Sequence, residues 1–152
     1  MLYPILKWLH ILSAIVAVGS NITYGVWLAR AANRPEVLPF TLRGIKVIDD
    51  RLANPSYGLL LVTGLLMVFA VDLPLTTPWL LSALVLYALL VLVGLLLYTP
   101  TLRQQIQVVE GQGSDSPEYQ SASKRGTLIG ILLAILAVAI IFLMVVKPSL
   151  WA

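Results

Sequence analysis

The sequence predicts an all-α protein, an antiparallel four-helix transmembrane bundle. The ten Lys and Arg and the seven Asp and Glu residues all lie outside four charge-free segments, which are 8–29, 52–71, 73–102 and 126–146. About 20 helical residues, each rising about 1.5 Å, cross a hydrocarbon core. The chain is 59% hydrophobic and 11% charged, whereas a soluble domain is about 25% charged. We therefore expect a single integral membrane domain over 1–152, with spans at about 4–31, 55–71, 79–99 and 125–147.

The basic residues predict the orientation of the bundle. Four spans put both termini and the 72–78 link on one side, and the 31–50 and 99–125 connections on the other. Eight of the ten basic residues lie on the second side: Arg30, Arg34, Arg43, Lys46, Arg51, Arg103, Lys124 and Arg125. Because basic residues concentrate in cytoplasmic loops, we expect both termini outside and the loops 31–50 and 99–125 in the cytoplasm. Trp8, Trp79 and Trp151 would then mark the outer interface.

The first span, about Pro4 to Ala31, has one small and polar face. At helical spacing this face carries His10, Ser13, Ala14, Ala17, Ser20, Asn21, Tyr24 and Trp27. The opposite face is Ile, Val and Leu, which suit lipid. The polar face should therefore point into the bundle.

The segment before the second span is amphipathic. Leu42, Ile45, Ile48 and Leu52 recur at helical spacing among charged residues. This pattern predicts an interfacial helix on the cytoplasmic leaflet, and the alternative is a plain connector. The second span should begin at Asn54-Pro55, with asparagine as the N-cap.

Short proline-containing segments delimit the third and fourth spans. The tight link after Leu73 predicts that spans two and three form an antiparallel hairpin. Pro78-Trp79 should open the third span, and Pro100 should kink or break it. Ser116-Pro117-Glu118 is typical of a helix start and places the beginning of helix 4 in the cytoplasm.

Small residues recur in helix 4 at four-residue spacing. These residues are Gly126, Gly130 and Ala134. A row of this kind lets another backbone approach closely. It predicts either packing within the chain or the interface of a homo-oligomer.

Composition narrows the classes of function. The four charge-free segments leave the middle of every span without Asp, Glu, Lys or Arg, whereas proton-coupled carriers and ion pumps use such groups near the midplane. The chain has no cysteine, which excludes thiol catalysis and cysteine metal sites. The basic residues flank the spans, so the expected partner is the lipid bilayer and not a nucleic acid.

His10 and Asn21 are the candidate chemical groups of helix 1. His10 is the only histidine, and an imidazole can ligate haem iron or relay a proton. The alternative is an interfacial histidine bonded to serine, a carbonyl or water. Asn21 would form an interhelical hydrogen bond of about 1 kcal/mol. A second histidine ligand to haem would require a second subunit.

Several short motifs resemble a bacterial membrane superfamily. Leu6-Lys7-Trp8-Leu9-His10, followed by Gly19 and Arg30, resembles the first helix of the membrane protoporphyrinogen oxidase and of the membrane domain of copper-resistance protein D. With Thr63-Gly64 and Pro78-Trp79-Leu80, the pattern is most similar to a neighbouring family of predicted integral membrane proteins of unknown function. The resemblance implies a bacterial inner (plasma) membrane location and a role for His10 as the ligand of haem b. His10, Ser13 and Asn21 are therefore the candidate cofactor-binding residues, and the small side chains of Ser13, Ala14 and Ala17 would leave room for the macrocycle. The oxidase has a lysine shortly after the Trp-Leu that opens helix 3, whereas residues 79–84 contain none.

These observations leave three functional hypotheses. The leading one is a small, non-enzymatic inner-membrane protein that binds a hydrophobic ligand or is a subunit of a larger assembly. The second is a haem-binding or porphyrin-related oxidoreductase that uses His10. The third is a small transporter, whose polar cavity would be lined by Ser13, Ser20, Asn21 and Thr63.

Overall fold

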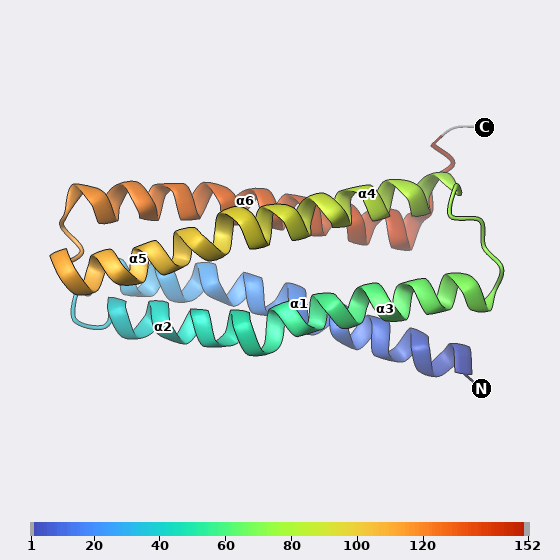
Figure 1. The fold of residues 1–152 in the computed structure, drawn as a ribbon, viewed down its shortest axis with the longest axis horizontal. Coiled ribbons are helices and arrows are strands. Elements are labelled where there is room, and N and C mark those ends of the chain that lie inside the picture. The colour runs from blue at the N-terminus through green and yellow to red at the C-terminus, as the bar shows by residue number, and fades with distance from the viewer. Residues whose placement is uncertain (1, 151–152) are drawn as a thin grey trace.

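Four long antiparallel helices make up the computed structural model, which describes residues 2–150 (Figure 1). The first is α1 (Leu2–Ala31) and the last is α6 (Pro117–Val146). The second joins α2 (Leu38–Ile48), the π-helical turn η1 (Asp49–Ala53) and α3 (Asn54–Ala70). The third joins α4 (Pro78–Val93), the π-helical turn η2 (Gly94–Tyr98) and α5 (Thr99–Gln112). The described residues form no strand, and the all-α prediction is confirmed.

Each of the four helices is long and apolar enough to cross a membrane, which confirms the transmembrane bundle. The helices have 30 to 35 residues and are therefore at least about 45 Å long. A hydrocarbon core is only about 30 Å thick. The bundle therefore continues past the membrane, at the end where α2, α5 and the first turns of α6 carry their charges.

The chain connections follow the predicted grouping. The two ends of the described chain and the 71–77 link lie at one end of the bundle, and the 32–37 and 113–116 turns lie at the other (Figure 1). At the first end, the Lys147 ammonium lies 5.2 Å from the centroid of the Trp79 ring. Trp151, predicted at the same interface, lies outside the described residues.

The second long helix begins earlier than predicted. It starts at Leu38, and Asn54 is an internal residue with helical dihedral angles and not an N-cap. The Asn54 N–H bonds to the carbonyl of Asp49, five residues back. This widened turn accommodates Pro55, which lacks an N–H and would crowd a regular α-helical turn. The helix consequently continues where the sequence predicted a start.

The third long helix also has a π-helical turn directly before an X-Pro pair. The Thr99 N–H bonds to the Gly94 carbonyl, and Pro100 follows at once. Pro100 therefore does not break the helix, which runs on to Gln112.

The amphipathic segment is helical, but the prediction that it lies on the leaflet is wrong. Leu38, Leu42 and Ile45 are buried against the bundle, where α2 packs along α5 and α1. The exposed Arg43 Nε donates to Glu110 Oε1 at 2.6 Å, which links α2 to α5. The apolar face is therefore covered by protein.

The start of α6 was predicted correctly. The Ser116 hydroxyl accepts a hydrogen bond from the Tyr119 N–H at 3.2 Å, with Pro117 at the first helical position. Gly126 lies against α5, where an added Cβ would come within 2.4 Å of Gln105 Nε2. At Gly126 the small residue therefore serves packing within the chain.

The bundle consists of two helix pairs over the length of α3 and α4. α1 packs against α3, and α4 packs against α6. Within the described residues, no Cα of α3 lies within 8 Å of a Cα of α4, although the two are consecutive in the chain. The predicted antiparallel hairpin is present, since α3 and α4 run in opposite directions and are joined by the 71–77 link (Figure 1), but the two helices separate and do not pack against each other.

Candidate functional site: a cleft between α3 and α4

A cleft of about 580 Å³ lies where α3 and α4 separate. Its walls come from the second and third long helices, while Asn21 of α1 and Leu133 of α6 contribute at its base. Leu61, Leu92 and Leu95 also line it and are exposed on the surface that faces lipid. The cleft therefore opens toward the membrane.

Both π-helical turns border this cleft. η1 supplies Asp49 and is followed by Asn54, while η2 supplies Gly94, Leu95 and Tyr98. A π-helical turn adds a residue to the helix and re-aims the side chains beside it, and such turns are frequent at functional sites. The X-Pro sequences thus position polar groups at the inner end of the cleft.

A chain of hydrogen bonds connects three helices across the cleft. Asn21 Nδ2 donates to the Tyr57 hydroxyl at 2.5 Å, which links α1 to α3. The Tyr87 hydroxyl donates to the Tyr57 carbonyl at 2.6 Å, which links α4 to α3. The predicted interhelical bond of Asn21 is therefore present, and its partner is a residue of the cleft.

Among the described residues that line the cleft, Asp49 is the one acidic residue. It is 5% exposed, and Asn54 Nδ2 donates to its Oδ2 at a long 3.3 Å. The nearby Lys46 ammonium pairs with Asp50 instead. Among residues 2–150, no basic group lies within ion-pair distance of the Asp49 carboxylate.

Further polar groups lie close to the inner end of the cleft. The Tyr24 and Tyr98 rings stack, with centroids 6.5 Å apart and planes at 8°. The hydroxyls of Tyr24 and Thr101 are buried and have no hydrogen-bond partner in the part of the chain that the structure describes. Buried polar groups without partners are uncommon in native structures.

His10 lies apart from the cleft, between α1 and α3. Its Nδ1 is 3.0 Å from the Leu60 carbonyl oxygen and 3.1 Å from the Thr63 hydroxyl oxygen. The Leu60 carbonyl can only accept, and the Thr63 hydroxyl uses its own proton to donate to the Leu59 carbonyl at 2.7 Å. Nδ1 therefore carries the proton and donates. The ring also lies against Gly64, where an added Cβ would come within 3.0 Å of His10 Cε1.

The surroundings of His10 fit an interhelical hydrogen bond better than a haem. The ring fills the space between two helices, and neither the cleft nor the groove described below is lined by His10. Ser13, expected to leave room for the macrocycle, is buried and donates to its own helix at the Leu9 carbonyl. His10, Ser13 and Asn21 therefore do not form one site.

Sequence reasoning missed Asp49, Tyr57 and Tyr87 as members of a site. Asp49 was interpreted as part of a charged connection, because the segment before Asn54 was not expected to be continuous with the span. The sequence signal that could have indicated these residues was the repeated X-Pro pair, at Asn54-Pro55 and Thr99-Pro100, each of which directly follows a π-helical turn.

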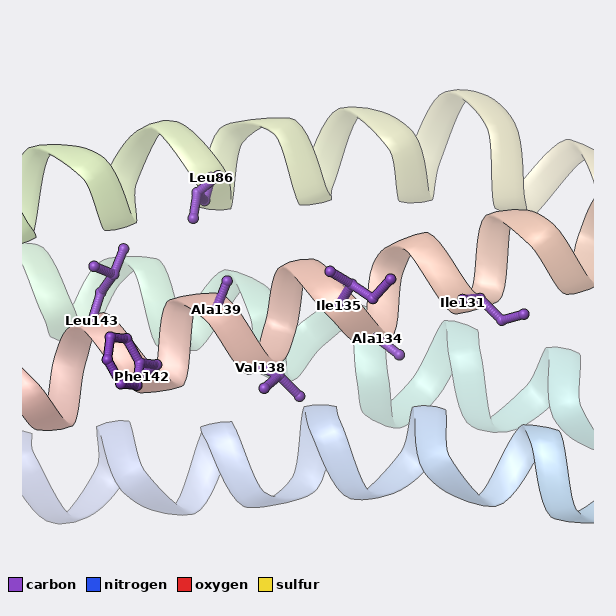
Figure 2. Close-up of a pocket in the computed structure, with 8 residues that line it drawn as sticks. All are labelled: Leu86, Ile131, Ala134, Ile135, Val138, Ala139, Phe142 and Leu143. Atoms are coloured by element: carbon purple, nitrogen blue, oxygen red, sulfur yellow. The ribbon is translucent and has the colours of Figure 1, made fainter.

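A second hollow is an apolar groove on the lipid-facing side of α4 and α6. Figure 2 shows Leu86 of α4 opposite residues of α6, and every lining side chain is apolar. Ala134 lies in this groove and is exposed, whereas no described atom lies within 4 Å of a Cβ placed on Gly130. The groove has no polar group that could orient a ligand.

Residues 4–148 match the family model described as "Predicted integral membrane protein (DUF2269)". The chain belongs to this family of integral membrane proteins of unknown function. No curated protein and no solved structure matches it.

Proposed function

We propose that this membrane protein binds an amphipathic ligand with a long apolar chain in the cleft between α3 and α4. The observation that carries the proposal is the combination, in one cleft, of polar groups at the inner end and an apolar opening toward lipid. A volume of about 580 Å³ is also in the range of small-molecule sites. The polar end would hold a head group, and the tail would lie along the leucines of the opening.

Gly58 offers a direct way to close the cleft. It lines the cleft, and a Cβ placed on it would meet no atom within 4 Å outside its own part of the helix. Gly58→Leu therefore begins its side chain in open space and extends it into the cleft, and a leucine is favoured over glycine inside a helix by about 1 kcal/mol. The variant should keep its fold and lose its ligand.

The test is photolabelling of the purified protein in non-ionic detergent with a photoreactive long-chain alcohol. We expect the label to concentrate on peptides around Gly58 and Ala88, and Gly58→Leu to remove it there. Uniform labelling of all lipid-facing helices, unchanged in Gly58→Leu, would contradict the proposal.

The protein is proposed to lie in the bacterial inner membrane with both termini outside. The eight basic residues at the α2–α5 end support this orientation. Because the chain has no cysteine, single cysteines can be placed at Ser114 and Thr76. In intact cells an impermeant thiol reagent should label Thr76→Cys and spare Ser114→Cys. The reverse pattern would contradict the proposed orientation.

The other hypotheses have less support from the geometry. A haem at His10 would use Nε2, which the bonds of Nδ1 leave unprotonated in the neutral ring. The kinship with the oxidase and the copper-resistance protein stays a prediction. A transporter would need a polar path, whereas Ser13 and Thr63 bond to backbone carbonyls. A homo-oligomer through α6 would use Gly130 and Ala134, since Gly126 faces Gln105.

A further inference from the structure

We propose that the head group of the ligand is an organic cation, an ammonium attached to a long apolar tail, and that Asp49 pairs with it. This inference rests on the proposed function and names the class of ligand that the same cleft selects.

The first support is the state of the Asp49 carboxylate. It is 5% exposed, Asn54 Nδ2 donates to it over a long 3.3 Å, and the buried Tyr24 hydroxyl lies beside it. Lys46, one turn away, is engaged by Asp50. A buried carboxylate is costly unless a charge or several hydrogen bonds compensate it. A cationic ligand would supply the missing charge.

The second support is the aromatic lining beside Asp49. Tyr57, Tyr87 and Tyr98 all line the cleft. The faces of aromatic rings attract cations, and the effect grows where water is excluded. A carboxylate that shares a cleft with aromatic rings is thus suited to an organic ammonium.

The third support is that the residues lining the cleft disfavour an anionic head group. No Lys, Arg or His is among the described residues that line the cleft. The Tyr87 hydroxyl is already donated to the Tyr57 carbonyl, and the Asn21 amide is donated to the Tyr57 hydroxyl. An anionic head group that carries no ammonium of its own would meet the Asp49 charge with no cation to offset it.

The opening of the cleft accounts for the tail. Leu61, Leu92 and Leu95 lie at the membrane-facing surface, beyond the polar groups. An amphiphile could therefore enter from the bilayer with its cation directed inward. Such a cation could belong to a membrane lipid or to a free cationic amphiphile, and the experiment separates these sources.

The experiment measures competition against the photoreactive alcohol in non-ionic detergent. Dodecyltrimethylammonium carries a permanent cation, and dodecanol has the same tail without a charge. We expect dodecyltrimethylammonium to displace the cleft label at about tenfold lower concentration than dodecanol, as cation–aromatic contacts in a dry site allow. Phosphatidylethanolamine and phosphatidylglycerol, added in parallel, test the lipid source, since only the first has an ammonium.

The decisive variant is Asp49→Asn, with Glu110→Gln as the matched control. Glu110 pairs with Arg43 on the exposed outer side of α5, so its change removes the same charge far from the cleft lining. We expect Asp49→Asn to reduce the preference for the cation to what the aromatic rings alone supply, while dodecanol still competes, and Glu110→Gln to keep the full preference.

Two results would overturn the inference. One is equal competition by the charged and neutral compounds in the original sequence, and the other is an intact preference in Asp49→Asn. If the cleft is labelled but shows no preference, only this inference falls. If the cleft is never labelled, the proposed function falls with it.

Discussion

His10 and Asp49 are both polar residues of the bundle, yet their surroundings differ. The His10 ring fills the space between α1 and α3 and donates to groups of α3. The Asp49 carboxylate lines an open cleft, is almost fully buried and accepts a long hydrogen bond from Asn54, with the Tyr24 hydroxyl beside it. A polar group satisfied by its neighbours holds helices together, whereas a buried group beside a hollow is available to a ligand.

The largest expected effect comes from a change at the His10 contact. Gly64→Leu should destabilise the protein by about 1–3 kcal/mol, because the backbone of α3 lies close to the His10 ring and cannot accept a large side chain. Thermal unfolding in detergent is the measurement.

The matched control is Gly58→Leu, the same substitution six positions earlier in α3. Gly58 faces the open cleft, so this variant should unfold at or above the original temperature. Equal destabilisation of both variants would remove the distinction between a packed contact and a hollow.

A smaller effect is expected from His10→Ala. The change removes one interhelical hydrogen bond, which costs about 1 kcal/mol in a membrane bundle. Thr63 keeps its bonds to the Leu59 and Leu60 carbonyls, so no hydroxyl loses its partner. Thermal unfolding should show a modest loss.

The same variant tests the haem hypothesis. Protein purified with haem available should show no Soret band that depends on His10, because the ring already fills its space between the helices. A Soret band that disappears in His10→Ala would restore haem as the ligand and make the packing account of this residue wrong.

The fold was largely predictable because avoidance of charge in lipid is a strong constraint on sequence. The four spans and the start at Ser116 follow from local signals. The start of the second helix was not predictable in this way, since Asn54-Pro55 has the local chemistry of a helix start. Only the π-helical turn before it lets the helix continue. The separation of α3 and α4 was not predictable for a related reason, because a short link limits the distance between helix ends but does not make the helices pack.

The candidate site was predicted only in part. Asn21 was identified from the polar face of helix 1, and its bond to Tyr57 places it in the cleft. His10 was identified because it is a lone histidine, but its role depends on Thr63 and Gly64, which are more than 50 positions away. Asp49 was not identified as a site residue, because the sequence places an acidic residue near the end of a span but does not reveal that its side chain is buried.

The most direct measurement is saturation binding of a radiolabelled long-chain alcohol to purified Gly58→Leu and His10→Ala, beside the original sequence. The account predicts that His10→Ala binds as the original protein does and that Gly58→Leu loses the saturable binding while remaining folded. Full binding by Gly58→Leu together with loss in His10→Ala would place the ligand at His10 and contradict the assignment of the cleft.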